Sequence, residues 1–553
     1  MPKATLLKTL SKNPSALFRD FAQAYVAGLQ NDDVANVSPP VAAEMLQQIW
    51  AFGKKRVNDE SLIEARVVEG SQKGWLHERT RIFIVSTDRA FIIDSITAEL
   101  NRRNLVIRTL LHPVVSVKRD DKGVIQAVEE RDQGKGTNES WLVIEVQGAI
   151  GATQAHLLVH DLQNVMNDVM LATRDWQRMK TALRTSIADI KKQKSRNSEI
   201  SVEECEAFLR YLHDNNFTLL GYREYKFSEK GGEVVSTVVP NQSLGVLSDE
   251  RNPVYVNKSS IPLPQDLQRL RKNAPLVSVY KVNRRSTVHR NVPLDAVTVK
   301  TTDAKGNVIG EKLFIGLFTS VTYSRSVSDV PLIRAKVRSV IEESRFAIDS
   351  HDFRAIAHIL EKYPRDELFQ MSTAQIATYA KSILHLQDRP RLALYPRVDE
   401  FRRYISCLIY IPRDRYETNL RLAIQRILET ELEGKCENFY TTLDDSPVAR
   451  VIYVIATEQR IRRTYDFAAV ERKLVEASRT WAERLNYSIM ESTPDERQAI
   501  ALSMSYDTAF DAGYQENHSA NQAISDITKI EEAIRTHRIA LDFYEGEGGD
   551  IRL

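Results

Sequence analysis

The residues RIFIVSTDRAFIIDSITAEL, Arg81 to Leu100, decide the fold of the first part of the chain. They open with a continuous apolar run up to Ser86, which predicts a buried strand. Apolar side chains then recur at helical spacing: Phe91, Ile92, Ile96 and Leu100. Thr87 and Asp88 stand where a helix is capped, so the sequence predicts a strand that turns directly into an amphipathic helix.

The same alternation continues beyond Leu100. Leu105 to Val117 and Trp141 to Val146 predict two more strands, with a hairpin turn at Asp121-Lys122-Gly123 between them. A second helix presents a row of apolar side chains on one face: Leu158, Leu162, Val165 and Val169. Strand, helix, strand, strand, helix is the order of a ferredoxin-like α+β unit.

The 553 residues must form several domains, because one hydrophobic core rarely organises more than about 250 residues. We expect a multidomain α+β protein in which ferredoxin-like units and an antiparallel sheet domain are joined by helical segments. Its expected parts are a helical lead-in (1–60), a first ferredoxin-like unit (61–190), an antiparallel sheet domain (201–350), a helical connector (351–387), a second ferredoxin-like unit (388–487) and a helical segment (488–538). The last helix of the second unit is expected from Phe467 to Leu485. Within 539–553, Ile539 to Tyr544 predicts a strand without a partner, which we interpret as the truncated start of a further domain.

Composition and charge exclude several classes of protein. Lys and Arg number 76 against 74 Asp and Glu, so no global field attracts nucleic acid or anionic lipid. The three cysteines, Cys205, Cys407 and Cys436, are too few for a disulfide framework and are not spaced as zinc ligands. The sequence has neither a secretory signal nor about 18 consecutive apolar residues. These features favour a cytoplasmic protein that contacts neither nucleic acid nor membrane.

Motifs for catalysis are missing from the sequence. It contains no Walker-type loop, and we assign no catalytic, cofactor-binding or metal-binding residue. One turn stands out, Thr87 to Ala90, because free amides at a helix N-terminus attract a carboxylate and a neighbouring acid holds an ammonium. We therefore expect an amino-acid effector site that comprises Asp88, Arg89, Asp94 and His112. His112 and His289 each stand at the end of a predicted strand, next to Pro113 and Arg290, and are candidates for contact with a ligand or effector. The alternatives are an ordinary capped helix at the turn and, for the two histidines, burial with a bond to backbone.

Several longer segments carry a family resemblance. They include DRAFIIDSITAEL (Asp88 to Leu100), FLRYLHDNNFTLLGYREY (Phe208 to Tyr225), GEKLFIGLFTS (Gly310 to Ser320) and RRYISCLIYIPRDRYETNLR (Arg402 to Arg421). In this order, and over most of its length, the chain resembles the N-terminal half of the large bacterial NAD-dependent glutamate dehydrogenases.

The resemblance implies ACT-type units, which are ferredoxin-like folds that bind amino-acid effectors, around a PAS-like sheet domain at 201–350. It makes 539–553 the start of a third ACT-like domain. It also implies that the catalytic domain lies beyond Leu553, so that this chain alone is inactive and holds no cofactor, whereas the full-length protein uses NAD to deaminate glutamate. Implied partners are that catalytic domain and further copies of the chain, in a tetramer or hexamer. The alternative is a free-standing amino-acid-sensing ACT-domain regulator without a dehydrogenase.

Overall fold

The computed structural model describes residues 15–30, 38–57, 59–68, 79–129, 136–194, 199–230, 233–249, 261–262, 275–400, 402–457, 464–541, 544–545 and 551–552. The chain divides into two compact units, Met1–Thr378 and Tyr379–Leu553. None of the described helices is long and apolar enough to cross a membrane.

The first sheet is antiparallel throughout its paired strands. Its order is β1 (Leu62–Val68), β2 (Arg79–Thr87), β6 (Thr137–Gln147), β4 (Val114–Arg119) and β5 (Ile125–Glu129), and β3 (Ile107–Leu111) also pairs with β6. β3 and β4 follow each other along β6, so they are one strand broken at His112-Pro113. The predicted continuous strand from Leu105 to Val117 was wrong at this break, because Pro113 has no N–H for the ladder.

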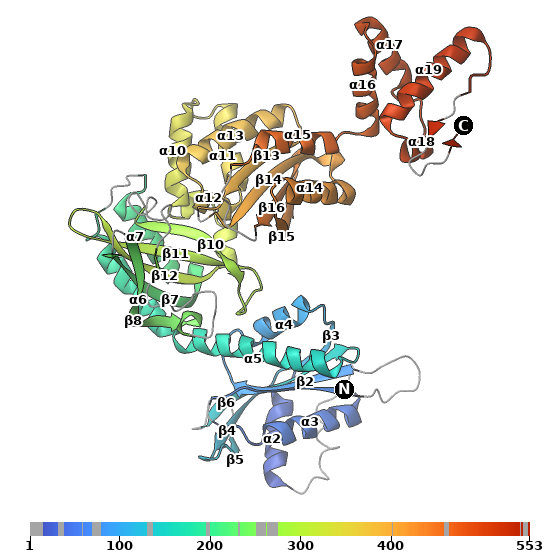
Figure 1. Ribbon diagram of the computed structural model, residues 1–553. Coiled ribbons are helices and arrows are strands. Elements are labelled where there is room, and N and C mark those ends of the chain that lie inside the picture. The colour runs from blue at the N-terminus through green and yellow to red at the C-terminus, as the bar shows by residue number, and fades with distance from the viewer. Residues whose placement is uncertain are drawn as a thin grey trace. The chain divides into compact units, whose positions relative to one another are not determined.

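Helices cover both faces of the first sheet, as Figure 1 shows. α4 (Ile92–Arg102) and α5 (Ala152–Arg174) pack on one face, where Ile82 and Ile84 point. α2 (Ala16–Gly28) and α3 (Pro39–Gly53) pack on the other face, against Phe83 and Val85. This explains why the strand reads as a continuous apolar run: alternate side chains enter two different cores. The helices of the expected lead-in thus belong to the core of the first sheet.

The middle sheet is also antiparallel, in the order β10 (Val277–Arg285), β11 (Pro293–Thr302), β12 (Val308–Phe318), β7 (Phe217–Lys230), β8 (Glu233–Gly245) and β9 (Ile261–Pro262). α6 (Trp176–Ile190) lies against β7, β8 and α7 (Val202–Tyr211), and η2 (Leu212–Asn216) leads into β7. α5 packs on β7, β8 and the short turn η3 (Val246–Ser248). Apolar side chains of both sheets therefore meet α5 in one continuous core.

Further helices complete the first unit: α9 (Ser320–Ser324), η5 (Val327–Asp329), α10 (Ile333–Ser344), α11 (His351–Lys362) and α12 (Arg365–Gln370). The next helix, α13 (Thr373–Asp388), begins in the first unit and continues into the second. α12 is tied to the middle sheet through Lys281, whose Nζ lies 2.6 Å from Asp295 and 3.1 Å from Asp366. Burial raises the pKa of Asp295 to about 6, against the opposing effect of the Lys281 charge.

The second unit holds a four-stranded antiparallel sheet, in the order β13 (Ala393–Val398), β14 (Tyr404–Pro412), β16 (Val448–Ala456) and β15 (Lys435–Thr442). A short turn, η6 (Arg413–Arg415), precedes α14 (Thr418–Glu431), which packs with α15 (Phe467–Ala477) on one face. Each ferredoxin-like sheet has one additional strand at its edge, β1 in the first sheet and β13 in the second. This strand precedes the ferredoxin-like motif in the sequence and pairs with the first strand of the motif, β2 or β14. The expected multidomain α+β class, with antiparallel sheets, is confirmed.

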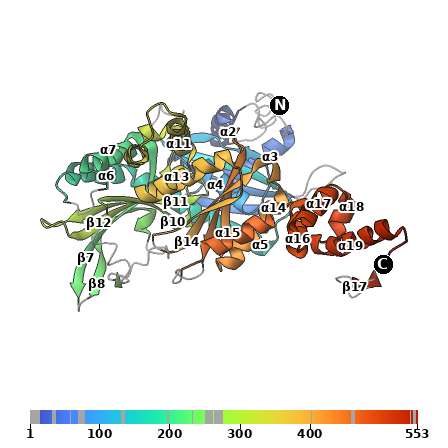
Figure 2. The same ribbon diagram turned by 90° about the horizontal axis from the view of Figure 1, so that it is seen from above.

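Four helices form a small bundle near the C-terminus: α16 (Trp481–Ser492), α17 (Glu496–Tyr506), α18 (Ala512–Asn517) and α19 (Ala520–Thr536), which Figure 2 shows grouped together. The predicted helix from Phe467 to Leu485 was wrong, because it is two helices. Thr480 begins the second one through a capping box with Glu483, which stops the chain from continuing in one helix.

The last strand prediction also needs correction. Residues 539–541 are irregular, residues 542–543 lie outside the described part, and only Tyr544–Glu545 (β17) is a strand. β17 pairs antiparallel with Ile551–Arg552 (β18), so this strand has a partner within the chain.

Candidate functional site

The predicted effector residues Asp88 and His112 meet at one serine. The hydroxyl of Ser140 donates to Asp88 Oδ1 at 2.6 Å, and its oxygen lies 3.0 Å from His112 Nε2. Ser140 belongs to β6, which runs between β2 and β3/β4, so the antiparallel register brings the ends of both neighbours to it. The break at Pro113 is what places His112 at the end of β3.

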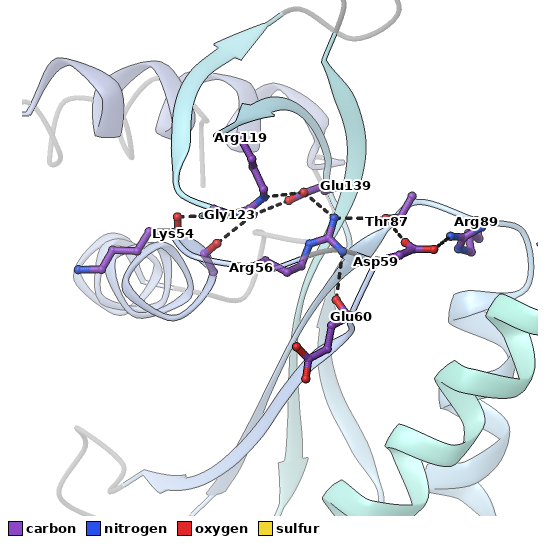
Figure 3. A network of polar contacts seen from close by, with 10 residues as sticks. Lys54, Arg56, Asp59, Glu60, Thr87, Arg89, Arg119, Gly123 and Glu139 are labelled. Atoms are coloured by element: carbon purple, nitrogen blue, oxygen red, sulfur yellow. Dashed lines mark hydrogen bonds and ion pairs between the residues drawn. The ribbon is translucent and has the colours of Figure 1, made fainter. Parts of the chain in front are cut away.

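Arg89 belongs to a second set of contacts. Its guanidinium pairs with Asp59, and the same carboxylate accepts a hydrogen bond from Thr87 Oγ1 at 2.6 Å (Figure 3). Thr87 and Arg89 are therefore fixed from the segment that precedes β1. The prediction that Thr87 and Asp88 cap the following helix was wrong, because both side chains bond elsewhere.

A buried carboxylate organises the surroundings of this turn. Glu139 accepts from Arg56 Nη2 at 2.7 Å, and from both Nε and Nη2 of Arg119 at 2.8 Å (Figure 3). Glu139 is fully buried, and the side chains of Arg56 and Arg119 are 3% and 11% exposed. We call Arg56, Glu139 and Arg119 the Glu139 clasp.

The clasp holds three parts of the first domain together. Arg56 Nη2 also donates to Thr87 Oγ1 at 3.2 Å, and Arg119 Nη1 donates to the carbonyl of Gly123 at 2.8 Å. The segment after α3, the turn after β4 and the end of β2 thus share one buried charge. Such a triad is costly to break, because removal of one member leaves an uncompensated charge in the interior.

Sequence reasoning missed the clasp. Glu139 stands two residues before the apolar run that begins at Trp141 in β6, and a charge so close to a buried strand needs a partner there. Its partners were not identifiable, because Arg56 lies 83 residues away and Arg119 lies 20 residues away. Only the strand order brings the three side chains together.

The N-terminus of α4 is occupied by another part of the chain. The helix begins at Ile92, and the residue at its cap position, Phe91, has a left-handed backbone with φ of 73° and no side-chain capping bond. His289, from the segment that joins β10 to β11, packs against Phe91 with 5.2 Å between the ring centres and 47° between the ring planes. Its ring Nδ1 lies 2.8 Å from Asp94, and its backbone N–H donates to Ser95 Oγ at 2.9 Å.

Asp94 and His289 were both candidates from the sequence, and they are partners. The segment from Ser286 to Val292 therefore docks on the first turn of α4, and we call it the docking segment. The structure brings Asp88 and His112 together, places Arg89 on Asp59, and places Asp94 at the contact with the middle sheet. A role for these four residues in effector binding stays a prediction.

A polar cavity of about 670 Å³ lies next to this contact. Its walls are α4 and α5 on one side and, on the other, Asp249 and the chain from Arg284 to Asn291. Within the described residues, no group of three or more His, Cys, Asp or Glu side chains is placed to hold a metal ion. The volume of this cavity is in the usual range for a ligand site.

Comparison with known families finds four matches along the chain. The chain matches the glutamate dehydrogenase ACT1 domain over residues 21–162 and the ACT2 domain over 393–482. It also matches helical motif 1 of glutamate dehydrogenase over 330–389 and helical motif 2 over 490–533.

Curated relatives agree with these matches. The NAD-specific glutamate dehydrogenase of Halomonas elongata is 30% identical over the whole of this chain and 34% of that protein. The enzymes of the same name from Pseudomonas aeruginosa and Mycobacterium tuberculosis are 29% and 26% identical, over 90% and 81% of this chain and 31% and 27% of those proteins. The chain spans about a third of the length of these relatives. By its four domain matches, and by relatives that align over most or all of it, this chain belongs to the glutamate dehydrogenase family with ACT domains and helical motifs.

Proposed function

We propose that this chain is the N-terminal regulatory and assembly region of an NAD-dependent glutamate dehydrogenase, a cytoplasmic enzyme. The full-length protein would oxidise L-glutamate to 2-oxoglutarate and ammonium while NAD is reduced to NADH. The ACT and helical-motif domains described here would regulate that reaction and help to assemble the enzyme.

One observation carries the proposal. ACT1, helical motif 1, ACT2 and helical motif 2 of glutamate dehydrogenase match in this order along the chain. The relatives that align with it are named NAD-specific glutamate dehydrogenases and are about three times as long. A chain that shares a third of such an enzyme is expected to serve the same reaction.

The described strands do not form the parallel sheet of a dinucleotide-binding fold. A dinucleotide fold needs parallel strands joined by helices, with a glycine-rich turn at a helix N-terminus. All three large sheets described here pair their strands antiparallel. We therefore assign no residue of this chain to NAD and derive no catalytic step from it.

Regulation is supported by the way the first domain is built. The docking segment joins the ACT1 helix α4 to the middle sheet through polar contacts, and a cavity lies beside it. A ligand that binds where two parts of a protein meet can favour one arrangement of them over another. Assembly is supported by exposed apolar side chains on the C-terminal helices, such as Met504 and Ile534.

The activity test compares this chain with the complete gene product. Purified residues 1–553 with glutamate and NAD should form no NADH above the protein-free blank, whereas the complete product should form it readily. Clear turnover by residues 1–553 would contradict the proposal. A reading frame that stops directly after Leu553 would instead favour the free-standing regulator.

The assembly test is separate. Light scattering coupled to size exclusion should give a mass of several chains for residues 1–553, with a tetramer or hexamer expected. A single-chain mass over the whole accessible concentration range would leave regulation as the proposed role and remove assembly.

A further inference from the structure

A cluster of charged side chains joins the middle sheet to the helix α12. Lys281 lies on β10, the edge strand of that sheet, directly opposite Asp295 on β11. Its Nζ lies 2.6 Å from Asp295 Oδ1 and 3.1 Å from Oδ2 of Asp366, which belongs to the first turn of α12. The hydroxyl of Tyr323, from α9, donates to Asp366 Oδ1 at 3.1 Å. We call Lys281, Asp295, Asp366 and Tyr323 the Lys281 cluster.

The Lys281 cluster holds more negative than positive charge. Asp295 and Asp366 both pair with Lys281, and within the described part of the chain neither carboxylate has a second cationic partner. Arg365, the neighbour of Asp366 on α12, pairs instead with Glu361. Tyr323 adds no charge, because a phenol is neutral at ordinary pH. With both carboxylates ionised, the cluster therefore has one negative charge in excess.

Burial makes this excess charge costly. The side chains of Asp295 and Lys281 are only 4% and 19% exposed. Burial raises the pKa of Asp295 to about 6; the charge of Lys281 opposes this rise and the charge of Asp366 adds to it. Burial also opposes the charge of Lys281, but the two carboxylates outweigh it and raise the pKa of Lys281 well above its ordinary value. Lys281 therefore stays charged, and Asp295 gains or loses a proton near pH 6.

Other contacts also hold α12, and they do not involve Asp295. The ring of Phe369 stacks on Phe318 of β12, with 4.8 Å between the ring centres and 7° between the planes. Lys336 of α10 donates to three backbone carbonyls at and just after the last turn of α12. The charge state of Asp295 therefore adjusts how firmly α12 is held, and the helix keeps its place in the fold.

We propose that the Lys281 cluster is a proton-operated latch, in which protonation of Asp295 holds α12 firmly on β10 and loss of the proton loosens the helix. Once Asp295 is ionised, it and Asp366 repel each other across one ammonium. Asp295 is fixed within β11 and accepts from the backbone N–H of Phe318 at 3.1 Å, so the strain falls on α12.

The latch acts on helical motif 1, because α12 lies within the residues 330–389 that match this motif. It therefore sets how firmly the motif is docked on the middle sheet. All four residues of the cluster belong to the first compact unit. The latch goes beyond the proposed function and can hold or fail independently of it.

The test measures hydrogen exchange of the peptide that contains α12, by mass spectrometry of the original chain at about pH 5 and about pH 8. Exchange rates are corrected for the chemical effect of pH on amides. The docked helix raises the pKa of Asp295, so docking is strongest below about pH 6 and weakens as pH rises through it. If this pKa returns toward about 3.8 when α12 moves away, protection should be about tenfold lower at pH 8 than at pH 5. The peptide that contains β6, in the first sheet, should change much less.

Two variants assign the effect to the cluster. Asp295→Asn keeps the shape of the protonated side chain and cannot ionise, so α12 should keep the same protection at both pH values. Asp366→Asn leaves one charge of each sign and should lose most of the pH dependence. Asp121→Asn, the same exchange at an exposed aspartate in the turn after β4, is the matched control and should behave like the original chain.

Infrared spectroscopy reports the proton directly. The difference spectrum between the two pH values should contain a C=O band of a protonated carboxyl that is weaker in Asp295→Asn than in the original chain. A purely structural role of Asp295 would not produce this band.

Several outcomes would overturn the proposal. One is that α12 in the original chain is equally protected at both pH values, or better protected at pH 8. Another is that Asp295→Asn keeps the full pH dependence, since a different group would then be the one that titrates. If Asp295→Asn fails to fold, as judged by circular dichroism, Asp366→Asn decides: an unchanged pH dependence in that variant would equally overturn the latch. The NADH assay on the complete gene product is independent of all these measurements.

Discussion

Replacement of Glu139 by glutamine should destabilise the first domain far more than its small change in size suggests. The side chain is fully buried and accepts one bond from Arg56 and two from Arg119. Glutamine keeps the shape but not the charge, so two buried guanidiniums lose their counterion. The expected cost is about 3–5 kcal/mol, the range seen when one member of a buried ion pair is removed.

The assay is differential scanning calorimetry with hydrogen exchange over the peptide that contains β6. For a domain of this size the cost corresponds to a fall of about 6–20 °C in the melting temperature of the transition in which the first sheet unfolds. Exchange protection in β6 should fall in parallel, because its amides bond to β2 and β4 around the clasp.

Glu64→Gln is the matched control. Glu64 also pairs with an arginine, Arg66, but these side chains are 37% and 46% exposed, so the same exchange should cost under about 1 kcal/mol. Equal shifts in the two variants would refute the reasoning, since burial of the charge would then not be the cause. An increase in stability for Glu139→Gln would refute it more strongly.

Three further outcomes follow from the structure. Burial raises the pKa of Asp295 to about 6 from an ordinary value near 3.8, so its contribution to stability is present at low pH and is lost as pH rises through about 6. The melting temperature of the original chain minus that of Asp295→Asn should therefore fall between about pH 4 and pH 7. A difference that stays constant over this range would contradict the prediction. Burial raises the pKa of the Cys205 thiol to about 12, so a thiol reagent at about pH 8 should modify Cys205 only after denaturation. Peptide mass spectrometry measures this modification, and rapid labelling of Cys205 in the folded chain would count against the prediction. Gly53→Ala should lower the free energy of unfolding by about 1–3 kcal/mol, because an added Cβ would lie 2.2 Å from the Trp141 ring. Urea denaturation measures this loss of stability. An unchanged denaturation midpoint would show that α3 shifts freely to make room for the methyl group.

The sequence predicted those parts of the fold that depend on local periodicity. The strand before Thr87 and the helix that contains Ile96 are present, because each buries a regular pattern of apolar side chains. The break at His112-Pro113 was missed, although Pro113 carries the signal for it. In the second unit, Thr480 with Glu483 carries the capping signal that divides the predicted helix.

The candidate site was less accessible to sequence reasoning. Asp94 and His289 were noted separately, but nothing in the sequence shows that residues 195 positions apart form one contact. The Glu139 clasp and the cavity depend in the same way on strand order and on the docking of two sheets. Local patterns determine which segments are strands or helices, and long-range packing determines which polar side chains meet.

The helix α5 carries a consequence for how this protein can be divided. Leu158, Leu162 and Val169 of α5 belong to one core with strand residues of the first sheet, such as Ile144, and of the middle sheet, such as Ile315. Neither sheet keeps a complete interior without the other. A gene fragment that ends between α6 and α7 would expose half of that interior to water. The smallest part of this region that should fold on its own is thus the pair of sheets together. Chimeras that exchange the ACT1 domain alone should aggregate, whereas chimeras that exchange the ACT1 domain and the middle sheet together should remain folded.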